Sequence, residues 1–220
     1  MQESGVMIPG DGVTLEGALA TPDGGGPFPA VVVCHPHPQY GGDMHNNVVV
    51  AMTQALVERG IVVLRFNFRG VGGSDGSHDN GQGEGDDVRA ALAHVGTFPE
   101  VDASSVGLAG YSFGASVAAA VGGDAVPALA LISTPAQSLR ALVGKAPLPS
   151  DSAPQLAVLL IVGDRDQYCH VATVQAVAAW LPGCDVETEI VTGADHFLFG
   201  HEGEVAGSVG DFFAGRLIPD

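Results

Sequence analysis

The sequence predicts an α/β fold in which helices cover both faces of a central, mostly parallel β-sheet. Short apolar runs of strand length alternate along the chain with segments of helical periodicity, which is the pattern of a parallel sheet covered on both sides. The runs in the middle of the chain are continuously apolar, as expected of strands that are buried on both faces. The 220 residues suit one domain that spans residues 1–220.

Seven strand-like runs define the predicted sheet. The first, VTLEGALA, alternates along its length and is expected to form an antiparallel strand at the edge of the sheet. The stretch TPDGGGPFP is a surface turn between the first two runs, and the later runs follow at intervals that leave room for helices. In chain order, the seven runs cover residues 13–20, 30–34, 61–67, 106–111, 128–134, 156–162 and 186–191.

Helical patterns fill the spaces between these runs. The pattern at 46–60 ends in a glycine, and the pattern at 170–183 stops at Pro-Gly. The pattern at 84–96 opens with acidic residues, which suit a helix N-terminus. A further helix is expected in the alanine-rich segment after Ser112. The other helical patterns cover residues 46–60, 84–96, 170–183 and 203–217.

Composition argues against several classes of protein. The net charge is −17, with only 8 basic residues, which repels nucleic acid and anionic membrane surfaces, so neither is expected as a partner. No apolar run reaches the roughly 18 residues of a membrane span, and the first residues do not resemble a signal peptide, which favours the cytoplasm. Three cysteines without metal-type spacing argue against a disulfide framework. None of these features predicts the oligomeric state.

The stretch GYSFG, residues 110–114, carries the strongest functional signal. It falls where a buried strand ends and a helix of small residues begins, which is the context of a nucleophile elbow. Ser112 needs an unusual backbone conformation to project its hydroxyl group, and side chains at Gly110 and Gly114 would clash within the tight turn. Ser112 is therefore the predicted nucleophile, in preference to a purely structural turn.

A serine nucleophile needs a base, and the base needs an orienting acid. The residues after two later strands supply both in the expected chain order of serine, acid and histidine. His196 is the predicted base, with His201 as its nearest rival because it follows the same strand. Asp166 is the predicted acid, because it lies further into its loop than Asp164 and can better reach a neighbouring loop. Asp195 adjoins the histidine in sequence, and neighbouring side chains usually diverge.

The loop after the strand at 30–34 is expected to help stabilise a developing oxyanion. One donor should be the backbone N–H of Phe113, directly after the nucleophile, and the other should come from this earlier loop. Pro36 and Pro38 have no N–H, so His37 or a later residue must supply it. We select the backbone N–H of His37.

The same loop contains side chains of the metal-ligating type. Their spacing lacks a close His-x-His-x-Asp-His pattern, and the later two read as the start of the next helix, so no metal and no cofactor are expected. His35 is instead expected to brace the loop through hydrogen bonds to backbone groups. The side chains concerned are His35, His37, Asp43 and His45.

The glycine-rich segment from residue 68 to residue 83 follows the strand at 61–67. Its glycine spacing does not match a phosphate-binding loop, and the chain supplies little positive charge there. We expect Arg69 to form a structural ion pair. The segment is expected to be mobile and to border the active site.

Five motifs occur along the chain in the order HPHPQYGGDMHNN, NFRGVGGSDG, GYSFG, GDRD and GADHF. With these motifs in this order, the sequence resembles the α/β-hydrolase superfamily over nearly its whole length. The chain looks most like small bacterial serine hydrolases without a lid, and is distantly similar to dienelactone hydrolases and prolyl oligopeptidases. The resemblance implies the same triad, Ser112, Asp166 and His196. Where many members have an aspartate before the Arg-Gly loop, this chain has Asn67.

The resemblance also shapes the expected activity. Dienelactone hydrolases carry a cysteine nucleophile, and Ser112 in its place favours ester chemistry. Larger relatives insert a cap where residues 135–155 are too few for more than a turn or two of helix, so the site should be open. The expected protein is a carboxylesterase acting on a small ester with a short acyl chain. A serine peptidase or a thioesterase is the alternative, followed by a metal-dependent hydrolase or an inactive binding protein.

Overall fold

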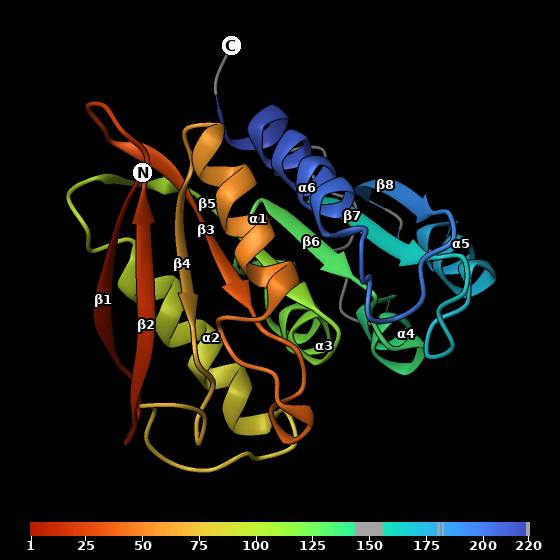
Figure 1. The fold of residues 1–220 in the computed structure, drawn as a ribbon, viewed down its shortest axis with the longest axis horizontal. Helices are drawn as coiled ribbons and strands as arrows, with labels where there is room; N and C mark the ends of the chain where they lie inside the picture. Colours follow the sequence, from red (N-terminus) through yellow and green to blue (C-terminus); the bar gives the residue numbers. More distant parts are fainter. Residues whose placement is uncertain (144–155, 180, 182, 219–220) are drawn as a thin grey trace.

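The computed structural model describes residues 1–143, 156–179, 181 and 183–218 (Figure 1). Among these residues, eight strands form one sheet in the order β1-β2-β4-β3-β5-β6-β7-β8. The strands are β1 (Gln2–Pro9), β2 (Thr14–Thr21), β3 (Phe28–Cys34), β4 (Val62–Phe66), β5 (Val101–Tyr111), β6 (Ala128–Ile132), β7 (Leu156–Gly163) and β8 (Cys184–Val191). The helices are α1 (Asn47–Glu58), α2 (Gln82–Val95), α3 (Phe113–Val121), α4 (Ala136–Val143), α5 (Val171–Ala179) and α6 (Glu202–Leu217), with short 3₁₀ turns η1 (Pro38–Tyr40) and η2 (Gly122–Asp124).

Helices cover both faces of the sheet, as the sequence predicts. Side chains of strand β3 alternate between the two faces, because successive residues of a strand point in opposite directions. Val31 and Val33 pack under helices α1 and α6, whereas Val32 and Cys34 pack under α2 and α3. Figure 1 shows α1 and α6 side by side on one face of the sheet.

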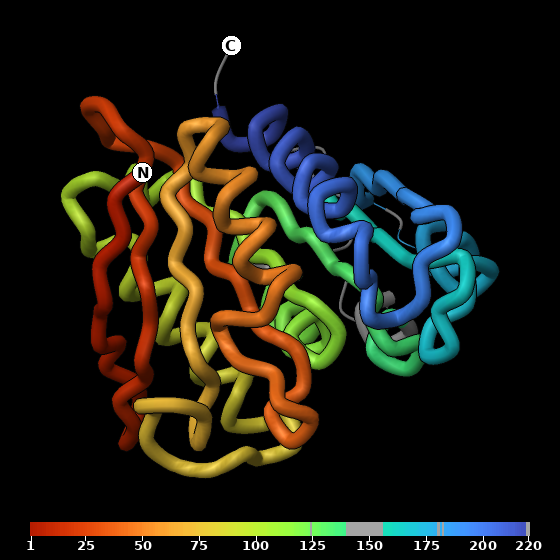
Figure 2. The backbone as a smooth tube through the Cα atoms, viewed as in Figure 1, coloured from red at the N-terminus to blue at the C-terminus, as the bar shows by residue number. Residues whose placement is uncertain are grey.

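The sheet is parallel except around β2. Strand β2 is antiparallel to both of its neighbours, β1 and β4, and the remaining strand pairs are parallel. The backbone tube in Figure 2 shows the N-terminal hairpin at one end of the sheet and β8 toward the other. This confirms the predicted antiparallel N-terminal strand in a mostly parallel sheet.

The prediction that VTLEGALA forms the edge strand is wrong. Strand β1 lies outside it and pairs along its whole length, from Gln2 opposite Thr21 to Pro9 opposite Thr14. The side chains of β1 are mostly exposed, so its sequence lacks the alternation of apolar residues that announces a half-buried strand. Strand β1 therefore depends mainly on pairing with β2, because Ile8 is its one fully buried side chain among the described residues.

The segment between β6 and β7 was expected to hold at most a turn or two of helix. Helix α4 has 8 residues, which is about two turns. The rest of that prediction, for residues 144–155, lies outside the described residues. Within the part of the chain that is described, no helix combines the length and the hydropathy needed to cross a membrane.

Candidate active site

The turn between β5 and α3 has the geometry of a nucleophile elbow. Ser112 stands between the last residue of the strand and the first residue of the helix, with φ 54° and ψ −112°. A side chain with φ in this region is strained, and such strain concentrates at functional sites. A Cβ atom at Gly110 would collide with the backbone of Gly114, and one at Gly114 would collide with the carbonyl of Cys34. Both glycines are therefore required by backbone packing, as predicted.

Hydrogen bonds join the three predicted triad residues into one chain. The Oγ atom of Ser112 lies 2.8 Å from Nε2 of His196, and Nδ1 of His196 lies 2.9 Å from Oδ2 of Asp166. Because Nδ1 faces a carboxylate, it carries the ring proton, which leaves Nε2 free to accept the proton of the serine hydroxyl. The structure thus brings together Ser112, His196 and Asp166, whose catalytic roles stay predictions.

The carboxylate of Asp166 is fixed by its own loop. Its second oxygen accepts hydrogen bonds from the backbone N–H groups of Tyr168, at 2.8 Å, and Cys169, at 3.0 Å. Burial alone would raise the pKa of Asp166. The hydrogen bond and charge of His196, together with the two N–H donors, outweigh this and hold the pKa of Asp166 below its usual value. Asp166 is therefore an ionised partner for an imidazolium.

The rival residues have other contacts. Oδ1 of Asp164 accepts the N–H of Gly193 at 2.8 Å, which ties the β7 loop to the β8 loop. Asp195 accepts the N–H of Phe197 within its own turn. His201 lies at the start of α6, where Nδ1 contacts Glu204 at 3.2 Å. These contacts agree with a bracing role for Asp164.

Tyr111 holds the backbone of His196 in place, and the sequence analysis did not identify this role. Its hydroxyl donates a hydrogen bond of 2.9 Å to the backbone carbonyl of His196. Burial, followed by the nearby charge of Asp166, raises the pKa of Tyr111, so the hydroxyl stays a donor. Its position within GYSFG, next to the nucleophile at a strand end, is the signal that could have revealed it.

The two predicted oxyanion donors follow the ends of the neighbouring strands β5 and β3. Phe113 is the first residue of α3, so its N–H has no carbonyl partner within the helix. His37 precedes η1, and its ring packs against that of Phe113 with centroids 4.8 Å apart. The close approach of Gly114 to Cys34 brings the β3 loop onto the start of α3. The arrangement is compatible with both donors, whose role stays a prediction.

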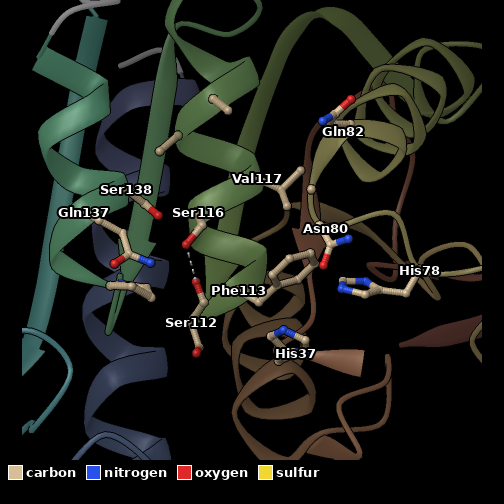
Figure 3. A pocket seen from close by; sticks show the side chains of 14 residues that line it. His37, His78, Asn80, Gln82, Ser112, Phe113, Ser116, Val117, Gln137 and Ser138 are labelled. Carbon is tan, nitrogen blue, oxygen red and sulfur yellow. Dashed lines mark hydrogen bonds between the residues drawn. The ribbon is translucent and has the colours of Figure 1, made fainter. Parts of the chain in front are cut away.

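A cavity of about 520 Å³ opens beside Ser112. Figure 3 shows α3 along its floor, Gln137 and Ser138 of α4 on one side, and His78 on the other, with Ser116 Oγ contacting the Ser112 carbonyl. Among the described residues that line the cavity there is no carboxylate, lysine or arginine. The lining residues are His37, His78, Asn80, Gly81, Gln82, Ser112, Phe113, Ser116, Val117, Ala119, Ala120, Pro135, Gln137 and Ser138.

The glycine-rich segment borders this cavity, as predicted. Behind His78, the carboxylate of Glu84 is fully buried and accepts the N–H groups of Asp79, at 2.8 Å, and Gly81, at 2.7 Å. Nδ1 of His78 lies 2.7 Å from the same carboxylate, although not in the alignment of a hydrogen bond. Burial would raise the pKa of Glu84, but the backbone donors and His78 together lower it. No sequence motif predicts the contact between His78 and Glu84.

Arg69 forms the predicted structural ion pair. Its guanidinium contacts both oxygens of Asp87, with a shortest distance of 2.7 Å, and its backbone N–H donates to the same carboxylate. Asp87 is buried and Arg69 nearly so. A Cβ atom at Gly83 would collide with this guanidinium, which explains the glycine there. The pair fixes the segment against helix α2.

The side chains of the metal-ligating type in the loop after β3 make separate hydrogen-bond contacts. Nδ1 of His35 lies 2.6 Å from the carbonyl oxygen of Pro36, and its Nε2 accepts the N–H of Phe68 at 3.0 Å, which is the predicted bracing role. Asp43 accepts the N–H of His45. No group of three histidine, cysteine or acidic side chains that could hold a metal ion occurs among the residues with described coordinates.

Asn67, at the position where the α/β-hydrolase resemblance leads one to expect an aspartate, uses both ends of its amide. Its oxygen accepts the N–H of Met44 at 2.9 Å, and its nitrogen donates to Glu16 at 2.7 Å. An aspartate would place two carboxylates in contact here, which costs free energy unless one is protonated. The neutral amide therefore suits its acidic neighbour.

The fold and this site define a serine hydrolase of the α/β class, and solved structures agree. An α/β serine hydrolase homologue from Coxiella burnetii is 32% identical with a TM-score of 0.81, covering 96% of this chain and 97% of that one. An α/β serine hydrolase without a lid from Xanthomonas campestris is 32% identical with a TM-score of 0.80, covering 100% of this chain and 97% of that one. The chain is confirmed as an α/β-hydrolase.

The family is also shown by sequence. The family model described as X-Pro dipeptidyl-peptidase (S15 family) matches residues 11–141, and the chain belongs to this family. The match includes Ser112 and ends before Asp166 and His196. A protein of Rickettsia prowazekii (strain Madrid E), described as uncharacterized, is 32% identical over 194 residues, which are 84% of this chain and 78% of the relative.

Proposed function

We propose that this protein hydrolyses small carboxylic esters through an acyl-enzyme formed on Ser112. One observation carries the proposal: the continuous hydrogen-bonded chain from Ser112 through His196 to Asp166, which opens into the cavity. Such a chain turns a weak serine hydroxyl into a nucleophile, because the base removes its proton during attack.

The reaction follows from the geometry of these groups. As Oγ of Ser112 attacks the ester carbonyl, Nε2 of His196 takes its proton, and Asp166 stabilises the resulting imidazolium. The carbonyl oxygen becomes negative and is held by the N–H groups of Phe113 and His37. The imidazolium then gives its proton to the leaving alcohol. A water molecule repeats the sequence on the acyl-enzyme and releases the acid.

The cavity favours a short acyl group. Its floor is the small-residue helix α3, including Ala119 and Ala120, and its sides carry the polar side chains of Asn80, Gln82 and Gln137. Each methylene gains about 0.8 kcal/mol only when it is fully buried against apolar groups. An alkyl chain is therefore stabilised where it lies on the apolar residues of α3, between polar sides, which favours a short acyl group.

A peptidase is the second candidate, because the matching family is described as an X-Pro dipeptidyl-peptidase. An enzyme that releases dipeptides must bind a free N-terminal ammonium near the scissile bond, and a desolvated ammonium needs a paired carboxylate. The described lining of the cavity contains none. This difference favours the ester, and thioesters remain within reach of the same chemistry.

The experiment is a comparison of kcat/KM for p-nitrophenyl esters from acetate to palmitate with that for an X-Pro p-nitroanilide. We expect a maximum at about two to six acyl carbons, since only those are buried. The Ser112→Ala variant controls for uncatalysed ester cleavage. A preference for palmitate would contradict the short acyl site, and faster cleavage of the anilide than of every ester would assign a peptidase.

A further inference from the structure

Three exposed aromatic side chains lie beside the histidine of the triad and outside the cavity described above. Tyr168 is 57% exposed, Phe197 46% and Phe199 72%. The ring of Tyr168 meets that of His196 edge to face with centroids 4.6 Å apart, and Phe197 does so at 5.8 Å. Phe199 stacks on Phe197 at 6.0 Å. The imidazole of His196 thus links the ring of Tyr168 to the stacked pair of Phe197 and Phe199, and these three rings are called the aromatic surface below.

The backbone conformation that keeps Phe197 and Phe199 at the surface is strained. Leu198, between the two phenylalanines, is fully buried with φ 57°, a region that bulky residues rarely adopt. With Leu198 turned into the core, Phe197 and Phe199 both remain at the surface. Strain and exposed apolar rings are both unfavourable, and their combination at an active site indicates a ligand.

The chemistry decides which part of a substrate reaches these rings. The leaving oxygen must come within about 3 Å of Nε2 of His196 to receive its proton. The rings of Tyr168 and Phe197 contact that same imidazole, which places them within reach of the group attached to the leaving oxygen. The cavity along α3 is lined by none of the three aromatic residues, so it is left for the acyl group.

We propose that Tyr168, Phe197 and Phe199 form the alcohol-side subsite of this hydrolase, and that the subsite takes planar, apolar alcohols such as arylmethyl groups. This inference rests on the proposed ester hydrolysis. Aromatic rings bind other aromatic rings edge to face or offset, and such contacts add free energy beyond the area they bury. The enzyme should therefore prefer a benzyl ester to an ethyl ester of the same acid.

The test compares benzyl acetate with ethyl acetate, which share the acyl-enzyme and differ only in the alcohol. We expect Phe197→Leu and Phe199→Leu each to reduce the benzyl-to-ethyl ratio of kcat/KM by about 3- to 10-fold, as the loss of one aromatic pair implies. Leucine keeps the side chain apolar and removes only the ring. Met7→Ala, which trims an exposed side chain on strand β1, is the matched control and should leave the ratio unchanged.

The outcomes separate this inference from the function on which it rests. An enzyme that cleaves no ester would contradict the proposed function itself. Equal loss on both esters would mean that the rings only position His196, which overturns the subsite. An unchanged ratio, with a dimer in sedimentation experiments that Phe199→Leu dissociates, would overturn it in favour of an interface between two copies of the chain.

Discussion

The two sides of the candidate active site are built in different ways. The side that carries Ser112, Asp166 and His196 consists of turns that follow the parallel strands β5, β7 and β8. The opposite side, the segment that contains His78, follows β4 as a long glycine-rich loop. Its position depends on two buried carboxylates, Glu84 and Asp87, that bind backbone N–H groups and a guanidinium.

Because of this difference, substitutions on the two sides should affect different properties, the catalytic rate on one side and the stability of the fold on the other. At the strand ends the sheet fixes the backbone, so a triad side chain can be changed with little effect on the fold. In the glycine-rich segment, the backbone is fixed by the buried carboxylates of Glu84 and Asp87 and not by a strand. Their removal leaves backbone N–H donors or the guanidinium of Arg69 without a partner. Substitutions on the first side should therefore reduce the rate, and those on the second should reduce the free energy of unfolding.

The largest effect is expected at the nucleophile. Ser112→Ala should lower kcat by roughly 10⁴-fold or more, because no other group can form the acyl-enzyme. The midpoint of urea unfolding should hardly change, since only one hydrogen bond is lost. Mass spectrometry after fluorophosphonate treatment should find the label on Ser112. A label on a different serine in an active Ser112→Ala enzyme would refute the assignment.

The two aspartates of the β7 loop should behave differently. Asp166→Asn should reduce kcat by about 10³- to 10⁴-fold, because the amide cannot stabilise the imidazolium or hold its tautomer. Asp164→Asn is the matched variant, as it alters the acceptor of the Gly193 N–H and an exposed contact with Arg165 but no contact with His196. Steady-state kinetics of both variants provide the measurement. Equal losses would show that the β7 loop acts through its shape and not through one carboxylate.

On the opposite side, breaking the buried ion pair should destabilise the protein. Asp87→Asn leaves the guanidinium of Arg69, which is 16% exposed, without its ion-pair partner and should lower the free energy of unfolding by about 3 kcal/mol, the lower end of the range for a buried pair. The neighbouring pair of Asp86 and Arg89 is exposed, so Asp86→Asn should change it by no more than about 0.5 kcal/mol. Urea denaturation measures both. Similar losses for the two variants would contradict the structural role given to burial.

The smallest effect is expected at His35, which connects the loop after β3 to the glycine-rich segment by accepting the N–H of Phe68. Burial lowers the pKa of His35 from 6.5 to about 4, against the opposing effect of the Pro36 carbonyl. The unfolded chain therefore binds the proton first, so stability is complete above about pH 6.5 and declines as the pH falls toward 4. Between pH 7 and pH 5, this one group should remove about 2 kcal/mol.

The contribution of His35 can be isolated by substitution. Glutamine can accept the N–H of Phe68 and has no proton to gain, so His35→Gln should have a shallower decline of stability between pH 7 and pH 5. The measurement is the difference between the unfolding free energies at the two pH values, in the native protein and in the variant. Identical declines would mean that other groups account for the acid sensitivity.

The sequence by itself determined the parallel sheet, the elbow at Ser112 and the order of the triad. These follow from local patterns: continuous apolar runs must be buried on both faces, and only glycine fits at Gly110 and Gly114. Because ligands of such sheets lie beyond the carboxyl ends of the strands, the residues after each strand are the candidates for a site. His196 and Asp166 were accordingly found from their places after β8 and β7.

Only the tertiary structure decided the rest. Strand β1 has no apolar alternation, so its pairing with β2 is invisible until the chain is folded. Asp166 and Asp164 are two residues apart, and which of them reaches His196 depends on how the loops after β7 and β8 meet. The side chains of His78, Glu84 and the aromatic surface beside His196 likewise have no motif. Their roles arise from contacts between distant segments, and local residue preferences do not encode such contacts.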